Sequence, residues 1–198
     1  MRRLSLLLFL LLAALAAAQS HDDTERGTAG VYLDYTRLQT VPLNLLGVGA
    51  RGGINVHKHF ALEGEFAYDF NGEASSQSCF GSGCVVGIFN VTTTGAHLLH
   101  GLFGPKVQTG GRRLRLFGEV KGGFVHLAAK TTLTEQGNPL FTPVSVSSSE
   151  THGALFPGGG VEFLKQRWGL RVEAGDEIFW SVGTHHNFKL MTGPELRF

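Results

Sequence analysis

The sequence predicts an all-β fold, an eight-stranded antiparallel up-and-down transmembrane β-barrel. Segments in which apolar and polar residues alternate recur along the chain, and the connections between them alternate between short and long. The last such segment ends on an aromatic residue with no loop after it. Alternation with a period of two is typical of strands that have one apolar face. An even number of strands with unequal connections at the two ends is typical of barrels that cross a membrane.

The first residues have the composition of a secretory signal peptide, which we assign to residues 1–18. An apolar run from Leu4 to Leu15 follows two arginines and leads into alanines that suit cleavage after Ala18. This run is shorter than the about 18–20 apolar residues of a spanning helix. We therefore expect an exported protein whose mature chain begins at Gln19.

Residues 19–27 are expected to form a flexible N-terminal lead-in, and residues 28–198 one barrel domain with no second domain. The formal net charge is +1 and no basic block occurs, so nucleic-acid binding is not expected. Cys79 and Cys84 are the two cysteines of the chain. Downstream of an export signal they are expected to form a disulfide bond that ties the tip of a loop. The pair offers too few ligands for a metal site.

Alternation predicts three strands in the first part of the chain, at residues 30–37, 45–56 and 60–70. The turn His57-Lys58-His59 joins the second and third of these strands as a hairpin. Residues 71 to about 93 are rich in Gly and Ser and are expected to form a long loop.

Five further strands bring the total to eight. The alternating pattern loses phase at Asp176, which suggests a bulge or a strand end there. Polar connections are expected at residues 131–150 and 181–185. The five strands are expected at residues 96–107, 114–127, 153–164, 168 to about 176, and 186–198.

Alternation alone does not separate a barrel in lipid from a soluble eight-stranded barrel such as a lipocalin, which would turn its apolar face inward. Three features of the sequence favour lipid. The polar face carries acidic and basic residues in near balance, it is rich in Gly, and aromatic residues gather near the strand ends. Because a Lys or Arg turned to lipid at the midplane costs about 2–4 kcal/mol, the charged face must point into the lumen. The predicted lumen network consists of Arg51, Glu63, Glu65, Arg115, Glu119, Lys121, Glu162, Arg171, Glu173, Lys189, Glu195 and Arg197.

The chain ends with Gly193, Leu196 and Phe198 at the spacing of the C-terminal signal that the barrel-assembly machinery reads in outer membrane proteins. Met191 stands where that signal usually has a polar residue. These three residues are therefore the predicted assembly signal.

Together with the strand plan, the turn segment 56–63 and the stretch Leu102–Lys106, this ending makes residues 30–198 resemble the OmpA-type eight-stranded outer membrane β-barrel domain family. The resemblance implies the bacterial outer membrane as location, with outer membrane lipids and the assembly machinery as partners. OmpA carries a peptidoglycan-binding domain after its barrel, which this sequence lacks, so attachment to the cell wall by that route is not implied.

Several histidines and serines are candidates for chemistry. His57 and His59 could bind a metal, but solvated turn histidines are the simpler interpretation, and no metal site is predicted. Strand residues His97, His100 and His126 are expected to pair with lumen carboxylates. A rim enzyme would use residues that the strand plan brings to the outer end, but their spacing shows no nucleophile beside its base. These rim residues are Ser147, Ser148, Ser149, His152, Asp176, His185 and His186.

The sequence thus predicts an exported outer membrane β-barrel with a structural or surface-interaction role and a lumen filled by polar side chains. It is expected to be monomeric, to need no cofactor and to have no enzymatic activity. A small porin remains an alternative, followed by a rim-located outer membrane enzyme and a soluble lipocalin-like carrier.

Overall fold

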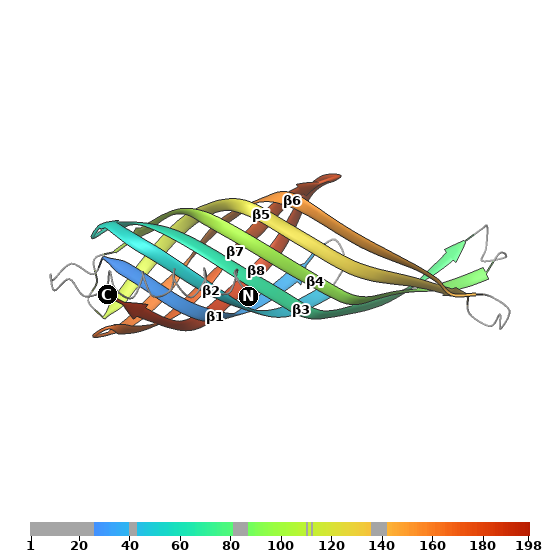
Figure 1. Ribbon diagram of the computed structural model, residues 1–198, viewed down its shortest axis with the longest axis horizontal. Coiled ribbons are helices and arrows are strands. Elements are labelled where there is room, and N and C mark those ends of the chain that lie inside the picture. The colour runs from blue at the N-terminus through green and yellow to red at the C-terminus, as the bar shows by residue number, and fades with distance from the viewer. Residues whose placement is uncertain (1–25, 40–42, 81–86, 110, 112, 136–141) are drawn as a thin grey trace, which may run out of the picture.

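In the computed structural model of the protein, the described part of the chain is a closed barrel in which the strands β1 to β8 follow one another in sequence order (Figure 1). Neighbouring strands are antiparallel, and β8 returns to pair with β1. The predicted eight-stranded antiparallel up-and-down barrel is therefore confirmed. The described residues are 26–39, 43–80, 87–109, 111, 113–135 and 142–198. The strands are β1 (Gly27–Leu38), β2 (Leu43–His57), β3 (Phe60–Phe80), β4 (Gly87–Gln108), β5 (Leu114–Glu135), β6 (Val144–Lys165), β7 (Trp168–Ser181) and β8 (Gly183–Arg197).

No helix long and apolar enough to span a membrane occurs in the part of the chain that the structure describes.

The two ends of the barrel differ in how the strands are joined. At one end, which we call the turn end, short turns join β2 to β3 and β6 to β7, and the C-terminus lies there (Figure 1). Gln166 in the β6–β7 turn has a φ of 55°, the left-handed conformation that two-residue hairpin turns use. At the opposite end, the loop end, Val182 alone separates β7 from β8, and Gly183 has a φ of 111°. The loop expected at residues 181–185 is therefore wrong, since β8 already begins there.

Four strands extend well beyond the loop end of the barrel (Figure 1). The long loops predicted at 71–93 and 131–150 are wrong over most of their length, because β3 to β6 continue through them. Residues 142–151 are all exposed, so neither face of this extension needs an apolar pattern. The abundant Val, Ser and Thr there still suit extended backbone, and pairing along the hairpins satisfies the backbone hydrogen bonds.

The bulge or strand end suggested at Asp176 is also wrong. Strand β7 pairs with β8 without a break from Trp168 to Ser181. Asp176 sits on the outward phase of the strand, where the apolar pattern ends, and its carboxylate contacts His186 Nδ1 at 2.6 Å. The next residue, Glu177, is fully buried in the lumen, so the alternation of faces continues.

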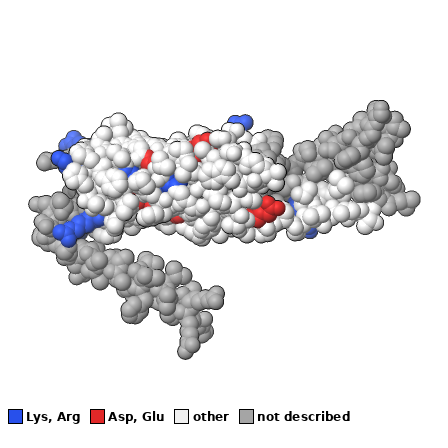
Figure 2. Space-filling model, turned by 90° about the horizontal axis from the view of Figure 1, so that it is seen from above, with Lys and Arg blue, Asp and Glu red and all other residues white. Residues whose placement is uncertain are grey.

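The outer surface of the barrel is apolar. On β5, for example, the outward residues between Leu114 and Phe124 carry no charge, and Leu116 and Val120 are about half exposed. The barrel wall in Figure 2 is mostly free of charged side chains, although Lys and Arg gather at its turn end. Charged side chains instead fill the interior. This arrangement is the reverse of a soluble carrier barrel and is the one that a barrel in hydrocarbon requires.

Candidate functional site

The lumen holds the candidate functional residues. Strand alternation turns all twelve residues of the predicted network inward, and each is at most 8% exposed. Five further polar residues share the interior with them: Asp34, Asp69, His100, Lys106 and Glu177. Among the described residues the lumen contains nine buried carboxylates and seven buried Lys or Arg side chains.

These charges form two groups along the barrel. The first, which we call the central network, has six carboxylates and six basic groups: Glu63, Glu65, Glu119, Glu162, Glu173, Glu195, Arg51, Lys106, Arg115, Lys121, Arg171 and Arg197. The second, which we call the loop-end cluster, contains Asp34, Asp69, Glu177, Lys189 and His100. The central network is therefore balanced in charge, whereas the loop-end cluster is acidic.

Arg171 is the best-connected basic residue of the central network. Its Nη1 lies 2.5 Å from Glu63 Oε1, and its Nη2 lies 2.7 Å from Glu119 Oε2 and 2.8 Å from Glu173 Oε2. Its side chain is 1% exposed. A planar guanidinium with several N–H donors suits such a position, because it can satisfy several carboxylates at once.

Two lysines extend the network around the lumen. Lys121 Nζ contacts Glu65 at 2.6 Å and Glu119 at 2.5 Å, while Lys106 Nζ contacts Glu162 at 2.8 Å and Glu63 at 3.2 Å. Each ammonium thereby links carboxylates from different strands. Buried ions are tolerated only when paired in this way, so the network holds the inner surfaces of the strands together.

Aromatic rings separate and cover the charged groups. Phe156 is fully buried, with Lys121 Nζ 5.8 Å from its ring centroid and Lys189 Nζ 5.6 Å away. A Cβ added to Gly158 or Gly175 would lie 2.5 Å from this ring, so both positions need Gly to admit it. Phe156 thus lies between the central network and the loop-end cluster.

Two more rings carry guanidinium groups on their faces. The Arg51 Cζ atom lies 4.3 Å from the ring centroid of Tyr32, and the Arg171 Cζ atom lies 4.0 Å from that of Phe117. These are cation–π distances. Paired charges and aromatic rings therefore share the lumen.

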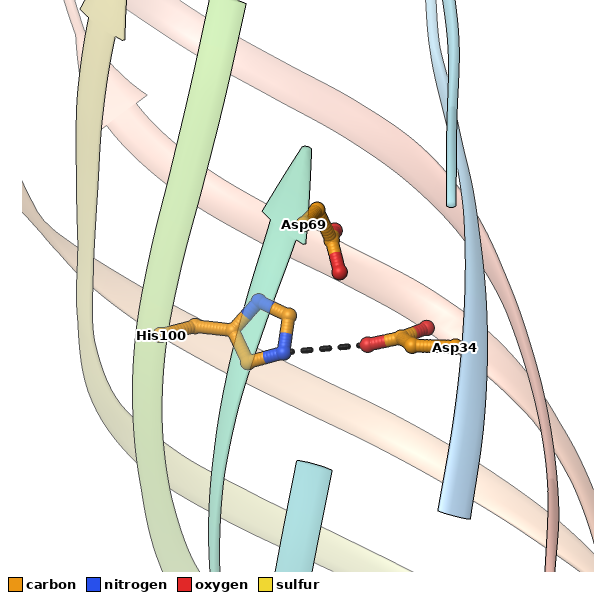
Figure 3. A group of neighbouring side chains, drawn as sticks. All are labelled: Asp34, Asp69 and His100. Atoms are coloured by element: carbon orange, nitrogen blue, oxygen red, sulfur yellow. Dashed lines mark ion pairs between the residues drawn. The ribbon is translucent and has the colours of Figure 1, made fainter. Parts of the chain in front are cut away.

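The loop-end cluster lies on the other side of Phe156. His100 Nε2 is 3.1 Å from Asp34 Oδ2, and His100 Nδ1 is 3.4 Å from Glu177 Oε2. Lys189 Nζ lies 2.8 Å from His100 Nε2 and 3.3 Å from Asp34 Oδ2. Asp69, the last carboxylate of the cluster, is fully buried beside them (Figure 3).

The histidine predictions had mixed outcomes. His100 does pair with lumen carboxylates. His97 and His126 do not, because both point outward: His97 stacks on Tyr68, and His126 contacts Thr151 and Ser149. The prediction that all three pair with lumen carboxylates is therefore confirmed for His100 and wrong for His97 and His126.

The rim residues do not assemble a catalytic group among the described side chains. Ser149 Oγ lies 3.2 Å from His126 Nε2, but the other nitrogen of that ring contacts the hydroxyl of Thr151 at 2.7 Å rather than a carboxylate. His152 pairs with Glu150, and His186 with Asp176, as separate exposed pairs. His185 stacks on Phe179, and Ser147 and Ser148 are exposed on β6.

The turn histidines lie at the turn end, far along the barrel from His185 and His186. The rings of His57 and His59 are 5.8 Å apart, and His59 Nδ1 contacts the carbonyl oxygen of Gln108 at 3.1 Å. Both residues are exposed, in keeping with solvated turn histidines.

The three residues of the predicted assembly signal lie along the seam between β8 and β1. A Cβ on Gly193 would lie 2.0 Å from the carbonyl oxygen of Val31, so the two strands approach too closely there for any other residue. Leu196 pairs with Ala29, and Phe198 continues the seam.

The predicted disulfide bond falls outside the described residues, which exclude Cys84 and the side chain of Cys79. It stays a prediction.

Fold and lumen together define a class of protein: an eight-stranded antiparallel barrel of the transmembrane type, apolar outside and filled with paired charges inside. No family model and no curated protein matches the sequence.

Solved structures of outer membrane barrels are similar in fold. Ail, the attachment invasion locus protein of Yersinia pestis in complex with the heparin analogue sucrose octasulfate, is 15% identical over 87% of this chain and 97% of that chain, with a TM-score of 0.48. The N-terminal β-barrel domain of Pseudomonas aeruginosa OprF is 11% identical over 86% and 97%, with a TM-score of 0.45. Neisserial surface protein A is 7% identical over 87% and 96%, with a TM-score of 0.48. At these identities the likeness is one of fold alone.

Proposed function

We propose that this protein is an exported outer membrane β-barrel with a structural or surface-interaction role, whose lumen does not conduct ions as a porin does. The observation that carries the proposal is the contrast between the two faces of the wall. The outward face is apolar along the strands, and the inward face carries sixteen buried Lys, Arg, Asp and Glu side chains among the described residues. The secretory signal predicted at residues 1–18 supports export to that membrane.

We expect the wild-type protein to show no stable large conductance in planar lipid bilayers. Arg171, Lys121 and Lys106 bridge carboxylates across the lumen at 2.5–3.2 Å, and the buried ring of Phe156 lies between Lys121 and Lys189. Moving an ion through would break buried pairs, which costs several kcal/mol for each ion left unpaired. Cell fractionation with gel mobility before and after boiling establishes that the tested protein is a folded membrane barrel. A reproducible open level in the nanosiemens range would contradict the proposal and favour a small porin.

The surface role is supported by the sheet that β3 to β6 form beyond the barrel. Strands β5 and β6 stay paired out to Leu133 and Val144, whereas the pairing of β6 with β7 begins only at Ala154. Residues 144–153 of β6 therefore pair on one side, and Val144 and Val146 are 53% and 62% exposed. An edge strand with unpaired N–H and C=O groups can accept an extended polypeptide as a further strand.

We expect the double substitution Val144→Lys and Val146→Lys to reduce attachment of cells that display the protein to a polypeptide-coated surface. Lysines on an edge strand oppose the addition of another strand. The control is Val144→Thr with Val146→Thr, which keeps β-branched residues and adds no charge. If all three proteins, present in equal amounts at the cell surface, give equal attachment, the edge strand of β6 does not bind the polypeptide.

The same proposal includes a monomeric barrel. Its partners are the outer membrane lipids and, during assembly, the barrel-assembly machinery. We do not propose an enzyme, because Ser149 and His126 face outward with a threonine in the place of an acid.

A further inference from the structure

The loop-end cluster has more negative charge than its own basic groups can balance. It contains the carboxylates of Asp34, Asp69 and Glu177, all at most 1% exposed, and the single ammonium of Lys189. Lys189 Nζ lies 2.8 Å from His100 Nε2, and Asp34 Oδ2 lies 3.1 Å from the same nitrogen. With a neutral imidazole, the form that binds a metal, the three carboxylates and the one ammonium leave an excess of two negative charges inside the barrel. A buried carboxylate without a partner is costly, so the cluster has a place for a further cation.

Asp69 shows where this cation would bind. Its side chain is fully buried, and neither of its carboxylate oxygens has a hydrogen-bond partner among the described residues. The carboxylate points toward His100 and Asp34, which come from two other strands (Figure 3). One ligand atom from each of the three residues lies within 4.8 Å of the other two. A Cβ on Gly47 would lie 1.9 Å from Asp69 Oδ1, so Gly47 leaves the space that the carboxylate occupies.

The central network provides a comparison within the same lumen. Glu65, Glu119 and Glu173 form a second group whose ligand atoms lie within 4.8 Å of one another. Lys121 Nζ lies 2.6, 2.5 and 3.4 Å from these three carboxylates, so the group already has a cation at its centre. Lys189 does not occupy the centre of the loop-end cluster in this way, since its Nζ contacts Asp34, Glu177 and His100 rather than Asp69.

We propose that Asp34, Asp69 and His100 bind one divalent first-row transition metal ion inside the barrel. Two carboxylate oxygens and one imidazole nitrogen form a ligand set that suits Zn²⁺, whose sites with three protein ligands keep one further position. A +2 charge also equals the excess negative charge of the cluster. Binding requires Lys189 to leave His100 and remain with Glu177, whose Oε2 is already 3.4 Å from the ammonium.

The surroundings of the site determine how the ion reaches it. Leu45 and Leu98 are at most 1% exposed, and they pair directly with Thr36 and Asp69 on the neighbouring strands. With these side chains around it, the site is closed in the folded barrel. The metal ion therefore enters as the barrel closes during folding, and it stays bound when free metal is removed afterwards.

The test is refolding of the urea-unfolded protein into detergent with Zn²⁺ present, followed by dialysis against chelator and native mass spectrometry. We expect one Zn²⁺ for each wild-type barrel. Asp69→Asn and His100→Gln should reduce the retained Zn²⁺ at least tenfold. Asp176→Asn, a matched substitution at the exposed rim, should retain Zn²⁺ like the wild type, and so should the double variant His57→Gln with His59→Gln in the exposed turn.

Lys189→Met gives a second measurement, because it removes the competing ammonium and leaves the three ligands. This variant should reach half-occupancy at a Zn²⁺ concentration about tenfold lower than the wild type does, a shift of about 1.4 kcal/mol in binding free energy. Wild-type barrels that retain no Zn²⁺ would overturn the proposal. The same holds if Asp69→Asn retains as much as the wild type, or if the turn-histidine variant loses the ion. These outcomes do not depend on conductance or attachment, so they are independent of the proposed function.

Discussion

We expect Arg171→Met to lower the free energy of unfolding by about 3–5 kcal/mol, the cost typical of breaking a buried ion pair by removing one partner. Arg171 contacts Glu63, Glu119 and Glu173 at 2.5–2.8 Å and is 1% exposed. Methionine keeps much of the side-chain length but no donor or charge. The three carboxylates would then depend on the remaining basic groups of the lumen: Lys121 beside Glu119, Arg51 beside Glu173 and Lys106 beside Glu63.

Urea unfolding of the barrel in lipid vesicles measures this effect, and two variants serve as controls. Arg171→Lys keeps the charge but not the planar fork, so an intermediate loss of stability is expected. Glu150→Ala removes a carboxylate that is 62% exposed at the rim and should change the free energy of unfolding little. A loss below about 1 kcal/mol for Arg171→Met, the size of an exposed ion pair, would show that the network does not stabilise the barrel.

Much of this fold follows from the alternation of residues in the sequence. Because strand side chains alternate between faces, the position of one charged residue fixes the face of its whole strand. Arg115, Glu119 and Lys121 share one phase of β5, and apolar residues such as Leu116 and Val120 take the other. The direction of each face then follows from the cost of placing a charge in lipid.

The pairing of the charges did not follow from the sequence. Arg51 meets Glu173, which is 122 residues away, and Lys106 meets Glu162, which is 56 residues away. Such contacts across the lumen depend on how far the strands are staggered when the barrel closes. Composition does not reveal that stagger. The sequence therefore indicated that the interior is balanced in charge, but not which residues form ion pairs.

Five lumen residues were left out of the predicted network for identifiable reasons. Glu177 is not in the predicted network because the apolar alternation ends at Asp176, one residue earlier. On β4, a single lysine among leucines gave a weak signal for Lys106, and His100 was expected only as a partner of the lumen carboxylates. Asp34 and Asp69 lie on the inward phases of β1 and β3, yet nothing in the sequence indicated that they meet at His100.

The extended hairpins were missed for a different reason. A strand is recognised in sequence by the contrast between its two faces, and this contrast disappears when both faces are in water. In the extension of β6, Val144, Ser147 and Glu150 are all exposed. The serine-rich composition there resembles a loop, although the backbone is extended and paired with β5.

The second large effect is expected at the other end of the chain, where deletion of Phe198 should reduce the folded fraction several-fold. The carbonyl oxygen of Phe198 accepts backbone hydrogen bonds from Arg26 at 2.9 Å and Gly27 at 2.8 Å, and its N–H donates to the Gly27 carbonyl at 3.0 Å. A Cβ on Gly27 would lie 2.4 Å from the Phe198 ring, so the ring lies directly over this glycine. These contacts close the seam between β1 and β8, which are the first and last strands and are not consecutive in the chain.

The seam forms last in any order of folding that proceeds along the chain, and its backbone groups have no other partners in a membrane, where each unsatisfied group costs several kcal/mol. The folded fraction is read from gel mobility before and after boiling, both in cells and after refolding into vesicles. Phe163→Ala removes an aromatic ring of similar exposure from β6, away from the seam, and should leave folding nearly unchanged. If deletion of Phe198 lowers the folded fraction in cells but not in vesicles, the role of Phe198 is recognition by the assembly machinery. If the deletion lowers the folded fraction in both, the role of Phe198 is closure of the seam. Equal effects of Phe163→Ala and of the deletion would exclude both roles.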